Sequence, residues 1–188
     1  MSKIWLTSDT HFGHDREFVW GPRGFNNVEE HDQAIIENWN KVVAPGDTVY
    51  HLGDVMLGDN KHGLECLEQL NGKIYIVKGN HDTVTREKLY FFDCDTVKDI
   101  NPAYWIKYNG ITFYLSHFPT ITSNLEKSAN LKEHIINLYG HTHQKTNFYE
   151  DIPFMYHVGV DSHNCTPILI DDIVKDIENK AQECVKYL

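Results

Sequence analysis

Several short apolar runs in this chain each end abruptly in a side chain that can bind a metal ion. The runs at residues 4–6, 48–52, 73–77, 111–115 and 135–139 read as buried strands. In open α/β sheets the functional crevice lies at the carboxyl ends of the strands, so polar residues following different strands can converge there. The chain must therefore fold so that these strand ends meet. The residues concerned are Asp9, His11, Asp54, Asn80, His81, His117, His141 and His143.

A single Asp or His after a strand is more often a turn or capping residue than a functional one. Five strand ends carrying such groups are much harder to explain by turn chemistry. Clustered carboxylates and imidazoles are costly without compensating charge, whereas a divalent ion compensates the carboxylates and uses neutral imidazoles as ligands. Twelve histidines in 188 residues, several closely spaced, point the same way. The pattern predicts a metal site.

The remaining segments predict a mixed α/β fold. Apolar spacing indicates helices over residues 29–43 and 61–70 and a final helix from residue 171, and another strand is expected at 154–160. Asn109-Gly110 between residues 104–108 and 111–115 predicts a β-hairpin, so part of the sheet should be antiparallel. No linker or repeat interrupts the chain, and we expect one domain over residues 1–188, a layered sandwich of mixed β-sheets flanked by helices.

The composition limits the classes of molecule that the protein can bind. The formal net charge of −10 disfavours an extended nucleic-acid groove, although bound divalent cations would attract a phosphorylated substrate locally. The four cysteines form no CxxC pair, and no apolar stretch approaches the ~20 residues that cross a bilayer. We therefore expect reduced thiols, a cytoplasmic location and no membrane association. Composition leaves the oligomeric state undetermined.

The order of the motifs resembles the calcineurin-like metallophosphoesterases. That family carries a DxH, a GD, a GNHD or GNHE, a lone His and a GHxH, and all five occur here in order. They read Asp9-Thr10-His11, Gly53-Asp54, Gly79-Asn80-His81-Asp82, Ser116-His117 and Gly140-His141-Thr142-His143. The resemblance extends from residue 4 to about residue 170.

This resemblance implies two divalent metal ions. One would be held by Asp9, His11 and His143, the other by Asn80, His117 and His141, with Asp54 bridging both. Mixed oxygen and imidazole ligands suit Mn²⁺, Fe, Zn²⁺ or Ni²⁺, and we expect Mn²⁺. A hydroxide bridging the metals would attack the phosphorus of a phosphomonoester or phosphodiester, which we expect to be a small molecule or a nucleotide.

The resemblance also implies roles around the metals. His81 would stabilise the developing charge or protonate the leaving oxygen, with Asp82 orienting its ring, although capping of the next segment is nearly as good a reading of Asp82. Asn80, His14 and Arg23 are expected to contact substrate. His51 is expected to support the ligands or satisfy a core hydrogen bond.

Two alternatives to this enzyme remain open from the sequence. A protein of the same fold can act as a noncatalytic metal-binding scaffold, and a nuclease could act on nucleic-acid ends. The presence of His81 and all seven ligands favours the enzyme over the scaffold. The absence of a basic cluster disfavours the nuclease. Substrate identity depends on surrounding loops and does not follow from the metal ligands.

Overall fold

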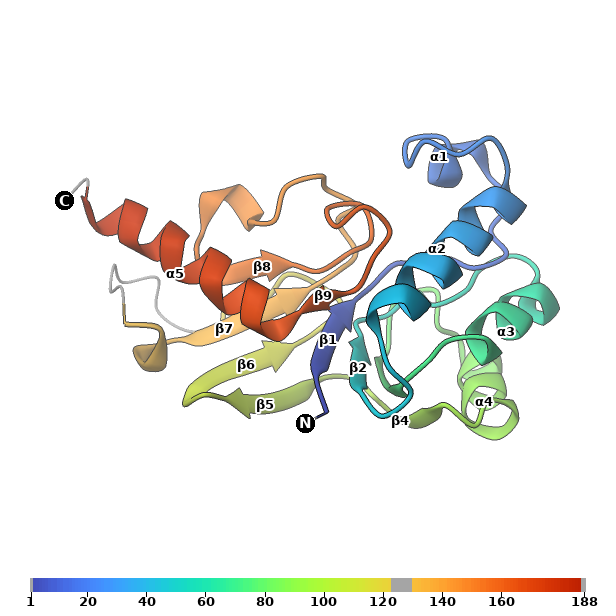
Figure 1. The fold of residues 1–188 in the computed structure, drawn as a ribbon, viewed down its shortest axis with the longest axis horizontal. Coiled ribbons are helices and arrows are strands. Elements are labelled where there is room, and N and C mark those ends of the chain that lie inside the picture. The colour runs from blue at the N-terminus through green and yellow to red at the C-terminus, as the bar shows by residue number, and fades with distance from the viewer. Residues whose placement is uncertain (1, 123–129, 187–188) are drawn as a thin grey trace.

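The computed structural model describes residues 2–122 and 130–186, with side chains through residue 183, and contains two β-sheets flanked by helices (Figure 1). In the first sheet β1 (Ile4–Thr7), β2 (Thr48–His51), β3 (Lys73–Val77) and β4 (Val97–Asn101) run parallel. The short β9 (Ile168–Leu169) pairs antiparallel with β1, giving the order β4-β3-β2-β1-β9.

The second sheet has the order β5-β6-β7-β8. Strands β5 (Tyr104–Tyr108) and β6 (Ile111–Leu115) form the predicted hairpin, and Asn109 and Gly110 both have positive φ, as a tight primed turn requires. Strands β7 (Ile135–Tyr139) and β8 (Met155–His157) continue the sheet in parallel with β6. Parallel strands therefore supply carboxyl ends to the same region from both sheets.

Alternate side chains of each strand in the first sheet point to opposite faces of the sheet. Apolar side chains are buried on both faces. Trp5 and Val49 belong to one apolar core, which is covered by α2 (Val28–Val42), α3 (Asn60–Glu68) and α4 (Val84–Asp93). Leu6 and Val77 belong to a second core, shared with the second sheet and with α5 (Ile170–Lys186). Figure 1 shows α5 and α2–α4 at opposite ends of the molecule.

Most of the predicted elements are confirmed. The strands at 73–77, 104–108, 111–115 and 135–139 have the expected bounds, and β1, β2, α2, α3 and α5 lie within two residues of theirs. The strand expected at 154–160 is only three residues long. Beyond it, Val158 N donates to Tyr139 O and Val160 N to Ser8 O, so this segment passes from the second sheet to the first.

Four elements were not predicted: α1 (Glu17–Trp20) within the expected loop, α4, β4 and β9. Strand β4 is an edge strand of sequence VKDIN and α4 buries only Tyr90 fully, so neither has a strong apolar period. Two short 3₁₀ helices, Leu131–Glu133 and Tyr149–Asp151, complete the described elements. Among the described residues, no helix has the length and apolar character needed to cross a bilayer.

Candidate metal centre

The structure brings the predicted ligands together at the carboxyl ends of five strands. They are Asp9 and His11 after β1, Asp54 after β2, Asn80 after β3, His117 after β6, and His141 and His143 after β7. Backbone hydrogen bonds join the loops: Asp9 N donates to Gly53 O, and Gly140 N to His117 O, each at 3.0 Å. The strand ends of both sheets thus form one site.

Five of these residues have left-handed backbone conformations, with φ between 49° and 66°: Asp9, His11, Asp54, His141 and His143. Non-glycine residues rarely adopt this region, and such strain persists only where surrounding structure enforces it. These five residues follow β1, β2 and β7, so the chain turns sharply after three of the five strands. The strain is concentrated where the ligands converge.

Two glycines permit the close approach of the loops. A Cβ on Gly79 would collide with Asp54 Oδ1, and it would lie 2.5 Å from the Asp54 backbone nitrogen. A Cβ on Gly140 would collide with Ser8 Oγ and lie 2.5 Å from Asp9 Oδ2. The glycines in the GNHD and GHxH motifs therefore leave room for the carboxylates of neighbouring loops.

Asp9, His11 and His143 form the first group of donors, with ligand atoms within 4.8 Å of one another. His11 Nε2 lies 3.2 Å from His143 Nε2, and His143 Nε2 lies 3.9 Å from Asp9 Oδ1. Burial, with the neighbouring charges of His143 and Arg23, lowers the pKa of His11 well below its ordinary value, so this imidazole is neutral. Neutral imidazole is the form that binds metals.

Asp9 provides a test of whether a cation fits. Its Oδ2 accepts hydrogen bonds from Ser8 Oγ at 2.5 Å and His141 N at 2.9 Å, but its buried Oδ1 has no hydrogen-bond partner in the described part of the chain. An unpaired carboxylate oxygen in the interior is costly. Burial raises the pKa of Asp9, although His143 and His117 oppose this. A divalent cation beside Oδ1 would satisfy this oxygen and favour the ionised carboxylate.

His117 and Asn80 form the second group with Asp54. His117 Nδ1 lies 2.8 Å from Leu52 O, and because a carbonyl only accepts, Nδ1 carries the proton. The Nε2 lone pair then faces Asn80 Oδ1 at 2.8 Å. Two acceptor atoms this close would repel each other, and a cation bound to both would remove that repulsion. His141 lies beside them, its ring centroid 5.0 Å from that of His117.

Asp54 lies between the two groups. Its Oδ2 is 3.7 Å from His11 Nε2 and 3.6 Å from His117 Nε2, whereas its Oδ1 accepts a hydrogen bond from His81 N at 2.8 Å. Asp9 also lies within the same cluster as Asp54 and His117. The two donor groups are therefore contiguous, and Asp54 is the residue that faces both.

Asp82 does not have either of the roles expected from the sequence. Its buried carboxylate accepts hydrogen bonds from four groups: the backbone N–H groups of Asp54, Val55 and Gly79 and the Tyr90 hydroxyl. The cap of α4 is Thr83, whose side chain accepts from Arg86 N. Asp82 therefore joins the loops after β2 and β3, and the expectation that it orients His81 or caps the next segment is wrong.

Arg23 also lies elsewhere than expected. Its side chain is only 2% exposed, and Nε and Nη2 donate to the two oxygens of Asp161, each at 2.9 Å. Nη2 also donates to Asp9 O at 2.9 Å, and Nη1 lies 2.8 Å from His31 Nε2. The guanidinium is thus engaged within the protein beneath the ligands. This arrangement contradicts the expected substrate contact.

Asp161 belongs to the site, and the sequence did not identify it as a candidate. Its Oδ2 lies 2.9 Å from His143 Nδ1. Burial opposes ionisation, but the hydrogen bonds from His143 and Arg23 hold the pKa of Asp161 well below its ordinary value. A carboxylate behind a ligating histidine is a common feature of metal sites. Asp161 follows the strand expected at 154–160, just as the predicted ligands follow other strands, and this position could have identified it.

His81 and His14 line a pocket of about 350 Å³ beside His11 and His143, together with Phe18 and Lys145. The His81 side chain is 42% exposed, with Nε2 4.0 Å from Asp54 Oδ2. Burial, with the neighbouring charge of His81, lowers the pKa of His14, and its buried Nδ1 has no hydrogen-bond partner among the described residues. Both imidazoles are placed where a bound substrate would lie.

His51 is buried behind the ligands rather than among them. Its Nε2 lies 3.0 Å from Thr10 Oγ1, which donates to Val55 O, so Nε2 is the donor to Thr10. Burial lowers the pKa of His51 to about 3. This neutral histidine therefore holds the residue between Asp9 and His11, consistent with the supporting role expected for it.

Comparisons with known proteins agree with this geometry. An uncharacterized protein of Methanocaldococcus jannaschii is 38% identical over 186 residues, covering 95% of this chain and 93% of its own. The Gene 66 protein of Mycobacterium phage L5 is 29% identical over 205 residues, covering 97% of each chain. The crystal structure of a protein of unknown function, AQ665 from Aquifex aeolicus, shares the fold, with a TM-score of 0.67 at 24% identity, covering 93% of this chain and 99% of that one.

The family model described as the calcineurin-like phosphoesterase superfamily domain matches residues 2–160. This range includes every residue of the seven-member ligand set and ends one residue before Asp161. The chain belongs to the calcineurin-like phosphoesterase superfamily.

Proposed function

We propose that the protein hydrolyses a phosphomonoester or phosphodiester at a binuclear divalent-metal centre. The observation that carries this proposal is the position of Asp54 Oδ2, which faces His11 on one side and His117 on the other. A carboxylate shared by two groups of nitrogen and oxygen donors is suited to bridge two cations. Membership of the superfamily supports phosphoester hydrolysis in general.

The ligands divide between two ions. Asp9, His11 and His143 would hold one ion, and the unpartnered Asp9 Oδ1 supports this assignment. Asn80, His117 and His141 would hold the other, with Asp54 common to both. The donors are carboxylate, amide and imidazole without thiolate, a set that suits Mn²⁺, Fe, Zn²⁺ or Ni²⁺, and we propose Mn²⁺ for activity.

When bound, the cations would supply Lewis acidity toward the phosphoryl oxygens and lower the pKa of a water molecule. The protein holds the donors ready for this. Nδ1 of His117 is held by Leu52 O, and Nδ1 of His143 by Asp161, so each ring directs its Nε2 into the site. Asp82 holds the loop of Asp54 through two backbone N–H groups. Little rearrangement is then needed when substrate arrives.

His81 is the candidate proton donor to the leaving oxygen. Its backbone N–H anchors Asp54 Oδ1 at 2.8 Å, and its ring extends to the pocket with 42% of the side chain exposed. A half-exposed imidazole can exchange protons with water after each turnover. General acid help of this kind contributes about 10²–10⁴-fold to the rate.

His14 and Asn80 are the residues that would contact the substrate. His14 lines the pocket with its ring 5.6 Å from that of Phe18, and its imidazole would hydrogen-bond a phosphate or leaving group. Asn80 would contact substrate through its side-chain amide while binding metal. The net charge of −10 and the modest pocket favour a small molecule or nucleotide over an extended polyanion.

A metal-by-substrate matrix tests the proposal. Metal-stripped protein is reloaded with Mn²⁺, Ni²⁺, Zn²⁺ or Mg²⁺ and assayed on nitrophenyl monoesters and diesters, cyclic nucleotides and single-stranded oligonucleotides. Asp54→Asn should abolish metal-dependent turnover, while Asp93→Asn, an exposed carboxylate at the end of α4, should leave it unchanged. Undiminished hydrolysis by Asp54→Asn would refute the mechanism.

His81→Ala separates chemistry from metal binding. Turnover should fall about 10²–10⁴-fold while both metals remain bound, as measured by elemental analysis after gel filtration. Loss of the metals in this variant would instead make His81 a supporting residue. Metal binding without turnover of any substrate by the unmodified protein would favour the noncatalytic scaffold, and turnover confined to oligonucleotide ends would favour the nuclease.

A further inference from the structure

Three further donor atoms gather between α2 and α3, apart from the seven ligands of the candidate centre. His62 Nε2 lies 3.0 Å from Asp32 Oδ2, and Cys66 Sγ lies 3.5 Å from His62 Nε2 and 4.0 Å from Asp32 Oδ2. The three atoms thus form a small triangle of one oxygen, one nitrogen and one sulfur.

The fold holds this triangle in place. His62 and Cys66 are four residues apart on α3, so they share one face of the helix. Asp32 reaches them from α2, and its carboxylate is fixed by Gly13 N, which donates to Oδ2 at 2.8 Å. The other oxygen, Oδ1, lies 2.7 Å from His31 Nδ1. The carboxylate is therefore oriented before any ligand binds.

The separations are within about half an ångström of the edges of a tetrahedral zinc site. With zinc bonds of about 2.0–2.2 Å to nitrogen and oxygen and 2.3 Å to sulfur, tetrahedral ligand atoms lie roughly 3.3–3.6 Å apart. Of the observed distances, 3.0 Å is below this range, 3.5 Å lies within it and 4.0 Å is above it. Shifts of a few tenths of an ångström would place all three atoms around one ion.

Charge favours the same ion. A carboxylate and a thiolate together balance a divalent cation, and histidine binds as a neutral ligand. Burial, with the charges of Asp32 and Glu65, raises the pKa of the Cys66 thiol to about 12, so without a cation it remains protonated. On binding, the Sγ–H proton would be released to solvent and an Sγ–metal bond would form, because a coordinating thiol is deprotonated by the metal.

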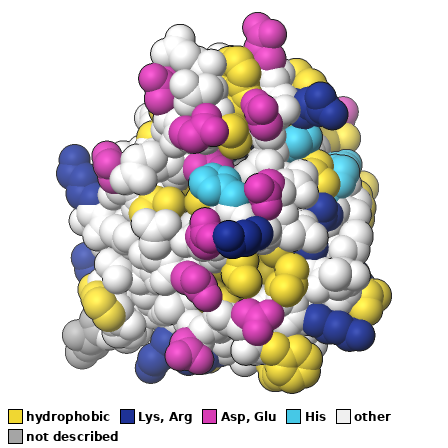
Figure 2. Space-filling model, turned by 90° about the vertical axis from the view of Figure 1, so that its right-hand side faces the viewer, with side chains coloured by type: hydrophobic (Ala, Val, Ile, Leu, Met, Phe, Trp, Pro, Cys, Tyr) yellow, Lys and Arg dark blue, Asp and Glu magenta, His cyan; other side chains and the backbone are white. Residues whose placement is uncertain are grey.

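An ion can reach the triangle from solvent. The His62 side chain is 37% exposed, whereas Asp32 and Cys66 are buried. Figure 2 looks onto the end of the molecule formed by α1–α4, where histidine side chains reach the surface among acidic ones. Such a surface attracts cations, and the exposed side leaves a fourth coordination position for water.

We propose that Asp32, His62 and Cys66 form a third cation site, of the zinc class, that joins α2 to α3. It is distinct from the binuclear centre, whose proposed ligands include no sulfur. The proposal does not depend on the proposed hydrolysis, because it rests on residues that take no part in that mechanism.

Cobalt titration tests this proposal directly, because only a thiolate ligand gives a sulfur-to-cobalt charge-transfer band in the near ultraviolet. Metal-stripped protein titrated with Co²⁺ should develop this band, and added Zn²⁺ should remove it. The band should be lost in Cys66→Ser and shifted to higher cobalt concentration in His62→Ala. It should persist in the triple variant Cys94→Ser, Cys165→Ser, Cys184→Ser, which retains Cys66 alone.

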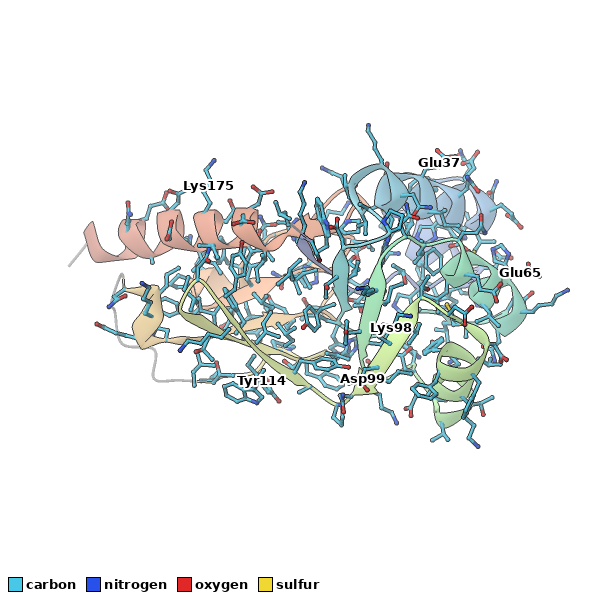
Figure 3. All side chains as sticks on the ribbon, turned by 60° about the horizontal axis from the view of Figure 1, so that its bottom comes forward. Glu37, Glu65, Lys98, Asp99, Tyr114 and Lys175 are labelled. Carbon is cyan, nitrogen blue, oxygen red and sulfur yellow. The ribbon has the colours of Figure 1, made fainter. Side chains whose placement is uncertain are left out.

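Glu37→Gln is the matched control for nonspecific binding by acidic side chains. Figure 3 shows Glu37 on the outer side of α2, and it is exposed, so its removal should leave the band unchanged. Circular dichroism checks that each variant is folded. Absence of the band from the folded unmodified protein would overturn the proposal, as would a band that survives Cys66→Ser.

Discussion

His143 Nδ1 donates a hydrogen bond to Asp161 Oδ2 at 2.9 Å. The direction follows from Asp161, whose carboxylate is ionised and also accepts Nε and Nη2 of Arg23. With Nδ1 donating to Asp161, His143 turns its Nε2 toward Asp9 and His11. Burial opposes protonation, but the hydrogen bond to Asp161 and the charge of Asp9 raise the pKa of His143, so a cation bound at Nε2 would take the place of a proton. A residue outside the proposed ligand set therefore determines which nitrogen of His143 would be available to a metal ion.

Replacing Asp161 should weaken metal binding more than it weakens the fold. Asp161→Asn keeps an oxygen acceptor of the same size but loses the charge that holds His143. We expect Mn²⁺ affinity to fall about 10–100-fold, the usual effect of losing such a partner. Isothermal titration calorimetry on metal-stripped protein measures this. Asp151→Asn, an exposed partner of Lys180, is the control, and equal affinities for both variants would contradict the assigned role.

Arg23→Lys distinguishes positioning from substrate contact. Lysine cannot reproduce the two parallel bonds to Asp161 or the bond to Asp9 O. Mn²⁺ affinity and the melting temperature should both fall, while KM at saturating Mn²⁺ should stay near that of the unmodified protein. A raised KM at full metal occupancy would instead support the substrate contact that the sequence led us to expect. Arg16→Lys, at an exposed position, should change neither quantity.

Gly140→Ala should disable the centre through Asp9. The added Cβ would lie 2.5 Å from Asp9 Oδ2, which also accepts from Ser8 and His141 N. Overpacking of this kind costs about 1–3 kcal/mol and displaces the carboxylate. Turnover and bound metal should therefore fall together. Gly46→Ala adds a Cβ with no atom within 4 Å and should leave both unchanged, so similar behaviour of the two variants would be inconsistent with this explanation.

Asp47 should contribute pH-dependent stability away from the centre. Its carboxylate accepts from Lys3 N, Trp5 Nε1 and Ala44 N. Although burial acts in the opposite direction, these hydrogen bonds lower the pKa of Asp47 below 3.8. A carboxyl with a lowered folded-state pKa stabilises the fold above its unfolded pKa, and this contribution is lost as the pH falls through the folded value.

Asp47→Ala leaves the buried Trp5 Nε1 without its partner, so the free energy of unfolding should fall by about 1–3 kcal/mol at neutral pH. The difference from the unmodified protein should shrink as the pH falls below about 4. Urea denaturation of the metal-stripped protein at several pH values measures both effects. A difference that stays constant from neutral to acid pH would show that the charge of Asp47 makes no contribution.

The sequence predicted which side chains converge at the strand ends, because each follows an apolar strand whose end is visible in the chain. It did not predict the role of Asp82. The hydrogen-bond partners of the Asp82 carboxylate include Asp54 N, which is 28 positions away and becomes adjacent only when β2 and β3 pair. Arg23 was misread for the same reason, since its contact with Asp161 spans 138 positions. The edge strand β4 was missed because VKDIN has no marked apolar alternation.

By itself the sequence determined the family, the mixed α/β class and the set of side chains that gather at the strand ends. These follow from local composition: apolar runs make strands, and the residue after each run is read directly from the chain. The tertiary structure decided which nitrogen of His117 and of His143 is free, that Arg23 and Asp82 are engaged inside the protein, and that Asp32, His62 and Cys66 meet. Hydrogen-bond partners distant in sequence are set by how the sheets and helices pack, and local pattern carries no record of that packing.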